Sequence, residues 1–204
     1  YYAVSSIGAI VHTINPRLKP EQIAWMINHA EDKFVMFDTT FAPIVNGVGA
    51  ACSTVEKWIC LSDEAGLPEM KVDVSDYESF IGDASEDIVW DRFDENTACT
   101  LCYTSGTTGD PKGVLYSHRS TILHAMAGSF QDVIGGGSND AILAVVPMFH
   151  VSAWGLVYSA AMVGAKGRTQ HSATEVLLFD VSGMSEQDID NSGITYEATF
   201  FNKD

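Results

Sequence analysis

The sequence predicts an α/β protein with a parallel-sheet core and helical crossovers. Residues 34–37 and 58–61 are continuous apolar runs, which are typical of strands buried on both faces. Segments between such runs carry apolar side chains at helical spacing, as residues 20–30 do. Strands that alternate with helices favour parallel pairing through helical connections, and no internal repeat competes with this interpretation.

In the first half of the chain, each element follows from a local pattern. An apolar helix is expected to end over residues 7–12, because Asn15 and Pro16 break the pattern that follows. Pro20 and Glu21 are residues that favour the start of a helix. We therefore expect four helices in this half: one whose last residues are 7–12, one that starts at residue 20, one at 41–51 and one at 75–80. We expect strands at 34–37 and 58–61.

The second half continues the alternation. We expect a strand at 98–103, a polar glycine-rich turn, a helix at 120–130, a strand at 141–146, a loop at 147–150 and a helix at 153–163. Residues 141–165 contain no Asp, Glu, Lys or Arg and are long enough to span a bilayer. Pro147 and His150 would be costly in a lone lipid-exposed helix, so we expect no integral membrane segment.

The net charge and its distribution argue against a nucleic-acid partner and indicate which part of the chain should hold a functional site. Lys and Arg total 11 against 27 Asp and Glu, for a net charge of −16. A nucleic-acid groove needs clustered cations, so we expect no nucleic-acid partner. Residues 62–95 carry a net charge of −10 and residues 170–204 a net charge of −6, which leaves the rest neutral. Such acidic runs are usually solvated faces, and the neutral remainder is the better place for chemistry.

The number of cysteines and the sequence at the two chain ends indicate the cellular compartment. Four cysteines in 204 residues are too few for a disulfide scaffold and suit a reducing compartment. No signal peptide is visible at Tyr1, and both ends look cut, so we expect a cytoplasmic location. Cys99 and Cys102 form a single Cys-x-x-Cys, which we expect to be two buried thiols. The methionines 26, 36, 126, 148 and 162 are expected to fill the core.

Residues 103–114, which read Tyr-Thr-Ser-Gly-Thr-Thr-Gly-Asp-Pro-Lys-Gly-Val, are the segment best suited to chemistry. Their glycines let backbone N–H groups approach a ligand, their hydroxyls add short donors, and Lys112 adds a cation. This combination predicts a nest for a polyphosphate in a bend between a strand and a helical segment. The spacing fits neither the ordinary P-loop nor a serine nucleophile elbow. An ordinary polar turn would not need so many donors together with a lysine.

The same stretch resembles the phosphate-loop signature of the adenylate-forming acyl-CoA synthetases. Residues 8–18 resemble the early helix–loop segment of that family, and residues 116–119 follow the loop as they do in fatty acyl-CoA synthetases. Residues 145–155 resemble the next motif in the form typical of long- and medium-chain fatty acid ligases. The resemblance covers about residues 1–167 and implies part of the large N-terminal domain of adenylate-forming enzymes.

The resemblance also implies a reaction and a phosphate site. The family activates a carboxylic acid with Mg²⁺ and ATP to an acyl-adenylate and pyrophosphate, and then transfers the acyl group to coenzyme A. The ATP phosphates would be held by Thr104, Ser105, Gly106, Thr107, Thr108, Gly109 and Lys112. Lys112 would also offset the charge on the departing pyrophosphate, and Thr104 would contact Mg²⁺.

Three further residues receive roles from the resemblance. His150 would lie beside the carboxylate and the α-phosphate and would act in catalysis with Lys112. Val151 and Trp154 would line the junction of nucleotide and acyl chain, with the Trp154 ring gating the acyl tunnel. The alternative for His150 is a structural histidine at a strand end, and without the resemblance Trp154 would be read as a core aromatic.

Other parts of the family pattern are not found, namely the later acidic Mg²⁺ ligand, the ribose-binding Thr-Gly-Asp segment, the hinge and the small C-terminal domain. We expect residues 1–167 to form a partial N-terminal AMP-binding domain and residues 168–204 a divergent acidic tail. The expected function is ATP-dependent ligation of a fatty acid to coenzyme A, impaired in this chain. The alternative is a non-catalytic nucleotide-binding or scaffold remnant. Acyl chain length and homo-oligomerisation are left open.

Overall fold

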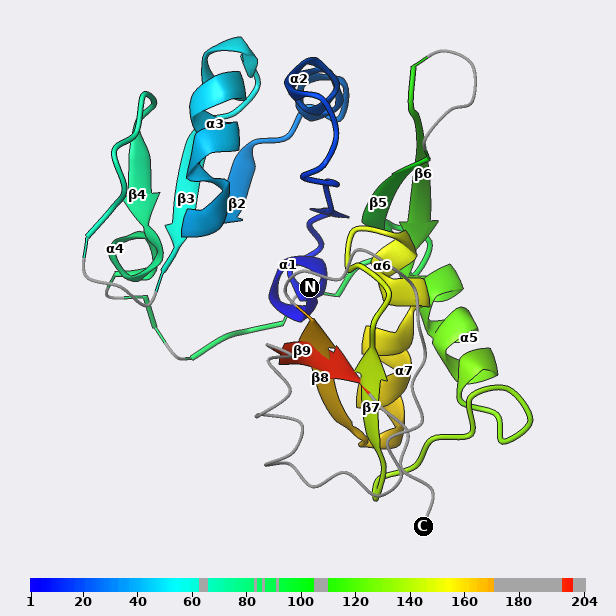
Figure 1. The fold of residues 1–204 in the computed structure, drawn as a ribbon. Helices are drawn as coiled ribbons and strands as arrows, with labels where there is room; N and C mark the ends of the chain where they lie inside the picture. Colours follow the sequence, from blue (N-terminus) through cyan, green and yellow to red (C-terminus); the bar gives the residue numbers. More distant parts are fainter. Residues whose placement is uncertain are drawn as a thin grey trace. The chain divides into compact units, whose positions relative to one another are not determined.

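The computed structural model describes residues 1–62, 66–82, 84–85, 87–90, 92–104, 110–170 and 196–199. Its contacts divide the chain into two compact units. The first unit comprises residues 1–13, 91–102 and 114–204, and the second comprises residues 14–90 and 103–113. Both units combine helices with strands, as Figure 1 shows, so the predicted α/β class is confirmed.

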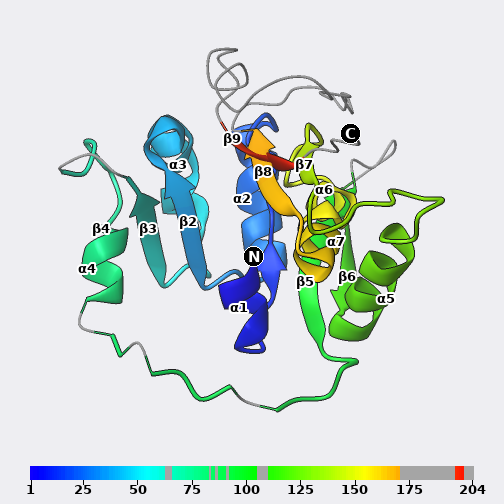
Figure 2. The same cartoon turned by 90° about the horizontal axis from the view of Figure 1, so that it is seen from below.

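The second unit is built on a parallel three-stranded sheet in the order β2–β3–β4 (Figure 2). Its strands are β2 (Phe34–Asp38), β3 (Lys57–Leu61) and β4 (Val74–Asp76). Its helices are α2 (Pro20–His29), α3 (Ala42–Val48) and α4 (Tyr77–Ile81), with 3-10 turns η1 (Thr39–Phe41) and η2 (Gly49–Ala51) around α3. The predicted helices at 20–30 and 41–51 and both predicted strands are therefore confirmed. The predicted helix at 75–80 begins two residues later, because Ser75 and Asp76 belong to β4.

Two aspartates at strand ends start the elements that follow. The Asp38 carboxylate accepts a hydrogen bond from the Thr40 backbone N–H at 2.8 Å, which caps η1. The Asp76 carboxylate accepts one from the Ser79 backbone N–H at 2.8 Å, which caps α4. Hydrogen bonds from the Ser79 side chain and backbone lower the pKa of Asp76 because they stabilise its charged form.

The core of the second unit lies where α2 and α3 pack on one face of its sheet. It includes Ile23 and Ile27 of α2, Val45 of α3, and Phe37 and Trp58 of the sheet. The helical spacing of Ile23, Ala24 and Ile27 puts these three residues of α2 on this face, whereas Trp25 contacts Tyr103.

The expectation that residues 34–37 are buried on both faces is wrong. Phe34 is 54% exposed and Met36 is 44% exposed, whereas Phe37 is buried. Alternate residues of a strand point to opposite faces, and only the face that carries Val35 and Phe37 packs against the core of this unit. Met36, Met126 and Met162 are all exposed, so the expectation that they fill the core is also wrong, whereas Met26 is fully buried.

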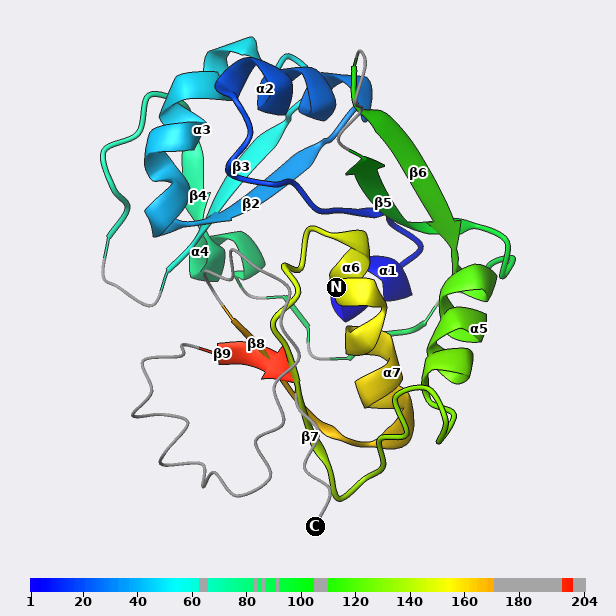
Figure 3. The same ribbon diagram turned by 45° about the vertical axis from the view of Figure 1, so that its right-hand side comes forward.

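The first unit contains two short sheets, in the orders β1–β5–β6 and β7–β8–β9. Their strands are β1 (Val11–His12), β5 (Ala98–Thr104), β6 (Lys112–Ser117), β7 (Ala141–Ala144), β8 (Lys166–Gln170) and β9 (Tyr196–Thr199). Its helices are α1 (Tyr2–Ser6), α5 (His118–Gly128), α6 (Val151–Trp154) and α7 (Leu156–Val163). β1 pairs parallel with β5, and β7 pairs parallel with β8. Figure 3 shows α5 beside α7, and the two helices are in contact.

The structure corrects the expected helix over residues 7–12. Helix α1 ends at Ser6, and Gly8 turns the chain in the left-handed region, with φ of 79°. Val11 and His12 then pair as a strand with Thr100 and Leu101 of β5. Of the residues that suggested a helix, only Val11 and His12 therefore join a sheet.

The uncharged segment 141–165 folds as a strand, a loop and short helices. Ala144 and Val146 form a buried cluster with Ala153 and Leu156. This arrangement confirms a strand followed by a packed helix within the segment. Throughout the described ranges, the structure contains no helix with the length and apolar character needed to cross a bilayer.

The contrast between Met26 and Met36 gives a direct test of this packing. Met26 is 1% exposed, and the Met26→Ala variant should lose about 2–5 kcal/mol of unfolding free energy because a cavity remains. Met36→Ala should lose less than about 1 kcal/mol. Urea unfolding of both variants measures the difference, and equal losses would contradict the core described above.

Candidate functional site

The polar loop predicted to bind phosphate lies between two strands. β5 ends at Thr104 and β6 begins at Lys112. The two strands are neighbours in one sheet, and the Thr104 hydroxyl donates a hydrogen bond to the Lys112 carbonyl at 3.4 Å. Both ends of the loop are therefore fixed close together. The predicted ligands between them, Ser105, Gly106, Thr107, Thr108 and Gly109, lie outside the described residues.

The expectation of a strand-to-helix bend is wrong, because a strand follows the loop. Residues 112–117 form β6, and helix α5 begins only at His118. Most side chains of β6 are exposed, so the sequence lacks the buried apolar run that marks a strand. Any anion held by this loop is therefore bound without the help of a helix N-terminus directly after it.

Lys112 and Thr104 are available to a ligand. Both residues are exposed. Among the residues that the structure describes, the Lys112 ammonium forms no ion pair. The loop thus presents a hydroxyl and a cation from its two ends to solvent.

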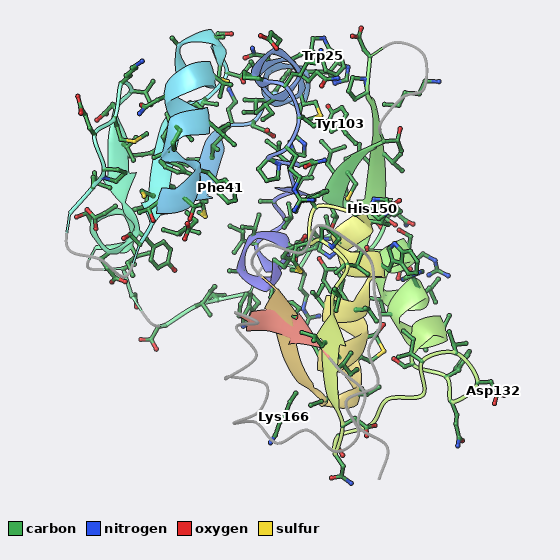
Figure 4. The ribbon with its side chains drawn as sticks, in the orientation of Figure 1. Trp25, Phe41, Tyr103, Asp132, His150 and Lys166 are labelled. Atoms are coloured by element: carbon green, nitrogen blue, oxygen red, sulfur yellow. The ribbon has the colours of Figure 1, made fainter. Side chains whose placement is uncertain are left out.

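An aromatic cluster on α2 anchors the residue before Thr104. The Tyr103 hydroxyl is hydrogen-bonded to His29 Nδ1 at 2.7 Å. The His29 ring stacks on Trp25 with centroids 4.5 Å apart, and Trp25 meets the Tyr103 ring edge-on at 6.2 Å (Figure 4). Burial raises the pKa of the Tyr103 phenol. Sequence reasoning missed Trp25 and His29. Their spacing of one helical turn was visible, but nothing in it indicated a contact with the loop.

The second predicted motif lies in the first unit, after β7. The His150 backbone N–H donates to the Pro147 carbonyl at 2.9 Å, which closes a turn, and His150 is exposed. The next two carbonyls accept hydrogen bonds from distant residues. The Tyr1 hydroxyl donates to Met148 O at 2.5 Å, and the Thr13 hydroxyl donates to Phe149 O at 3.4 Å.

The segment after His150 is a left-handed turn rather than the start of an ordinary helix. Val151, Ser152, Ala153 and Trp154 have φ between 50° and 57°. This conformation costs roughly 1–2 kcal/mol for each residue with a Cβ. The predicted helix at 153–163 therefore begins only at Leu156, where α7 starts. Such strain persists only where the surroundings hold it, and it is often found at functional sites.

Gly155 continues the left-handed conformation and is packed closely against His124. Gly155 has φ of 72°, and a Cβ at this position would lie 2.6 Å from His124 Nδ1. A side chain here would be unfavourable in conformation and would clash with His124 unless that ring moved. Trp154 is 48% exposed, so it is not a core aromatic, and Val151 is half-buried. Their predicted contacts with nucleotide and acyl chain stay predictions.

The Cys-x-x-Cys pair behaves as expected. Cys99 and Cys102 are both buried and free. They lie three residues apart in one strand and so point to opposite faces, which prevents them from ligating one metal together. Within the described part of the chain, no group of three His, Cys, Asp or Glu residues could hold a metal ion.

The predicted site residues divide between the two units. Thr104 and Lys112 belong to the second unit and lie at the two ends of one loop. His150, Val151 and Trp154 belong to the first unit and are consecutive or nearly so. Each group has a defined local geometry within its own unit.

Comparison with known sequences decides the family. The sequence model of the AMP-binding enzyme family matches residues 1–196. The chain belongs to this family. The predicted resemblance to adenylate-forming acyl-CoA synthetases is thereby confirmed.

Curated relatives of this AMP-binding chain are CoA ligases. It is 51% identical over 167 residues to a medium-chain-fatty-acid–CoA ligase of Ectopseudomonas oleovorans, covering 81% of this chain and 31% of the relative. It is 48% identical to a 3-methylmercaptopropionyl-CoA ligase of Ruegeria pomeroyi, with the same coverage. It is 42% identical to a long-chain-fatty-acid–CoA ligase of Thermus thermophilus, covering 91% and 34%. The chain thus spans about a third of the length of these relatives.

Solved structures agree on the fold. A Mycobacterium tuberculosis fatty acyl CoA synthetase matches with a TM-score of 0.65 and 26% identity, over 81% of this chain and 30% of that one. A red-emitting luciferase of Phrixothrix hirtus matches with a TM-score of 0.68 and 21% identity, over 78% and 31%, and shows the fold alone. The fold is that of the N-terminal domain of adenylate-forming enzymes.

Proposed function

We propose that this chain carries the phosphate-binding part of a fatty acid–CoA ligase. The observation that carries the proposal is the loop from Thr104 to Lys112, whose ends are fixed by two paired strands in a member of the AMP-binding enzyme family. A loop with clustered N–H and hydroxyl donors and an exposed lysine suits a triphosphate.

The reaction proposed for the whole protein has two steps. A carboxylate oxygen attacks the α-phosphorus of ATP, the bond between the α- and β-phosphates breaks, and pyrophosphate leaves. The thiol of coenzyme A then attacks the acyl carbonyl, and AMP leaves. In the first step negative charge gathers on the departing pyrophosphate, which a positioned cation such as Lys112 would stabilise.

Each loop residue has a proposed role in that step. The donors Ser105, Gly106, Thr107, Thr108 and Gly109 would cradle the phosphates together with Lys112. The exposed Thr104 hydroxyl would contribute one oxygen ligand to the Mg²⁺ that accompanies ATP, since Mg²⁺ prefers oxygen and takes few protein ligands. When bound, Mg²⁺ neutralises charge on the phosphate oxygens.

His150 is the second proposed catalytic residue. It is exposed and stands at the entry to the strained left-handed turn, where a donor is held outside the core. We propose that it steadies the charge that develops between the carboxylate and the α-phosphate. Val151 and Trp154, in the same turn, would line the junction of nucleotide and acyl chain.

The proposed acid substrate is a fatty acid, and the proposed location is the cytoplasm. Two of the relatives described above are fatty-acid–CoA ligases, and their identity to this chain is 51% and 42%. The Ruegeria relative is a 3-methylmercaptopropionyl-CoA ligase, so the choice of acid within the family varies. A panel of fatty acids of different length, with 3-methylmercaptopropionate included, would define the preference.

Removal of the loop lysine tests phosphate binding. Lys112→Ala should weaken Mg-ATP binding by about 10- to 100-fold, because one charge-assisted contact is lost. Isothermal titration of Mg-ATP measures the affinity. Lys71→Ala is the matched control, since Lys71 is an exposed lysine of the same unit outside the loop, and it should bind as the unsubstituted chain does. Equal affinity of all three proteins would remove the loop from the proposal.

Turnover separates the enzyme from a non-catalytic nucleotide-binding or scaffold module. With a fatty acid and Mg-ATP, an enzyme releases pyrophosphate and forms an acyl-adenylate that hydroxylamine traps. His150→Ala should lower the trapping rate by about 10²- to 10³-fold and leave Mg-ATP affinity within about two-fold. ATP binding without pyrophosphate release by the unsubstituted chain would favour the module.

A further inference from the structure

The loop that presents His150 depends on two hydroxyls from the other end of the chain. We propose that Tyr1 and Thr13 are positioning residues that hold the backbone before His150, so that its imidazole is presented in one orientation. This inference deepens the function proposed above and rests on it for the role of His150. Four observations within the first unit support it.

The first observation is which carbonyls are bonded. Met148 and Phe149 directly precede His150, lie in a turn, and belong to no helix or strand that would use their carbonyls. The Tyr1 hydroxyl satisfies Met148 O and the Thr13 hydroxyl satisfies Phe149 O. Because no backbone ladder holds these carbonyls, the two side-chain donors and the turn bond from His150 N–H to Pro147 O together restrain this stretch of backbone.

The second observation is that Thr13, one of the two donors, is itself fixed. The Thr13 backbone N–H donates to Leu101 O of β5 at 3.5 Å, and the Thr13 hydroxyl lies 3.9 Å from the buried Cys102 Sγ. Thr13 directly follows β1, which pairs with β5. The Thr13 hydroxyl that bonds the His150 loop is therefore held in place by the pairing of β1 with β5.

The third observation concerns the environment of the Tyr1 phenol. Burial raises the pKa of Tyr1, and this effect exceeds the opposite effect of the neighbouring Thr13 and Ser152 hydroxyls. An ordinary phenol is already protonated at neutral pH, and burial reinforces this state, so the Tyr1 hydroxyl remains a donor to Met148 O. The Ser152 hydroxyl is near enough to influence Tyr1, but it makes no well-formed hydrogen bond among the described residues.

The fourth observation is that the restraint next to His150 lies before the strained turn, whereas the Tyr2 contact lies beyond it, on α7. Tyr1 contacts the loop before the turn, through Met148 O. Tyr2 contacts α7 after it, through a hydrogen bond to Val157 O and an edge-on ring contact with Tyr158 at 5.9 Å. Left-handed residues with side chains would relax without such restraints. The bonds on the His150 side therefore resist relaxation of the backbone where His150 stands.

Tyr2 also supplies the matched control. Val157 lies within α7, so its carbonyl keeps a place in the helical hydrogen-bond ladder when the Tyr2 hydroxyl is removed. Met148 O has no such second partner among the described residues. Tyr1→Phe and Tyr2→Phe thus each delete one phenol-to-carbonyl bond, but only the first should release the His150 loop.

The test is an NMR measurement of the His150 imidazole in five proteins. The Cε1–Hε1 signal of His150, assigned with His150→Gln, should shift or broaden in Tyr1→Phe and in Thr13→Val. It should keep its position in Tyr2→Phe and in Thr13→Ser, which retains the hydroxyl. Urea unfolding of the same samples shows whether the two phenol deletions cost similar stability. An unchanged His150 signal in Tyr1→Phe and Thr13→Val, or an equal change in Tyr2→Phe, would overturn the proposal.

Adenylation gives a second readout. Thr13→Val should lower the turnover number for hydroxamate formation by about 10- to 100-fold, since small displacements of a catalytic group have effects of this size. Its KM for ATP should stay within about two-fold, and Thr13→Ser should restore turnover. If the unsubstituted chain forms no acyl-adenylate, the proposed function fails, whereas the His150 signal still decides the positioning role.

Discussion

The loop between β5 and β6, which we propose binds a polyphosphate, has its two ends tied together. Thr104 closes β5, Lys112 opens β6, and a hydrogen bond from the Thr104 hydroxyl to the Lys112 carbonyl joins them. Backbone donors bind an anion well when their arrangement exists before the ligand arrives. The aromatic cluster of Trp25, His29 and Tyr103 adds a second anchor next to Thr104. The nucleotide chemistry proposed for this family member depends on that restraint.

The backbone before His150 is also restrained, but by side-chain hydroxyls instead of by two paired strands. These hydroxyls belong to Tyr1 and Thr13, and the segment is followed by a turn that is unfavourable for ordinary residues. A strained segment is stable only where several contacts agree on its conformation. An exposed imidazole on a rigid, strained support is better oriented than one on a free loop, which is the property that charge stabilisation in a transition state requires.

Elements with strong local patterns were predictable from the sequence, whereas tertiary effects were not. The helical spacing of Ile23, Met26 and Ile27 predicted α2, and the apolar run at 58–61 predicted β3. β6 was missed because its side chains are largely exposed, and Met36 was misjudged because one face of β2 lies outside the core of its unit. The left-handed turn at 151–154 could not be predicted, since Val, Ser, Ala and Trp favour right-handed conformations and only long-range contacts hold them otherwise. The loop proposed to bind phosphate was singled out by its residue types, but the strand that follows it and its anchor on α2 became visible only in the fold.

Hydrogen exchange of the backbone amides in residues 104–113, followed by mass spectrometry, tests the central claim most directly. If the loop cradles the triphosphate with its N–H groups, Mg-ATP should slow exchange in peptides from this segment. AMP, which lacks the β- and γ-phosphates, should slow it much less. Identical exchange of these peptides with Mg-ATP, with AMP and without nucleotide would contradict the account.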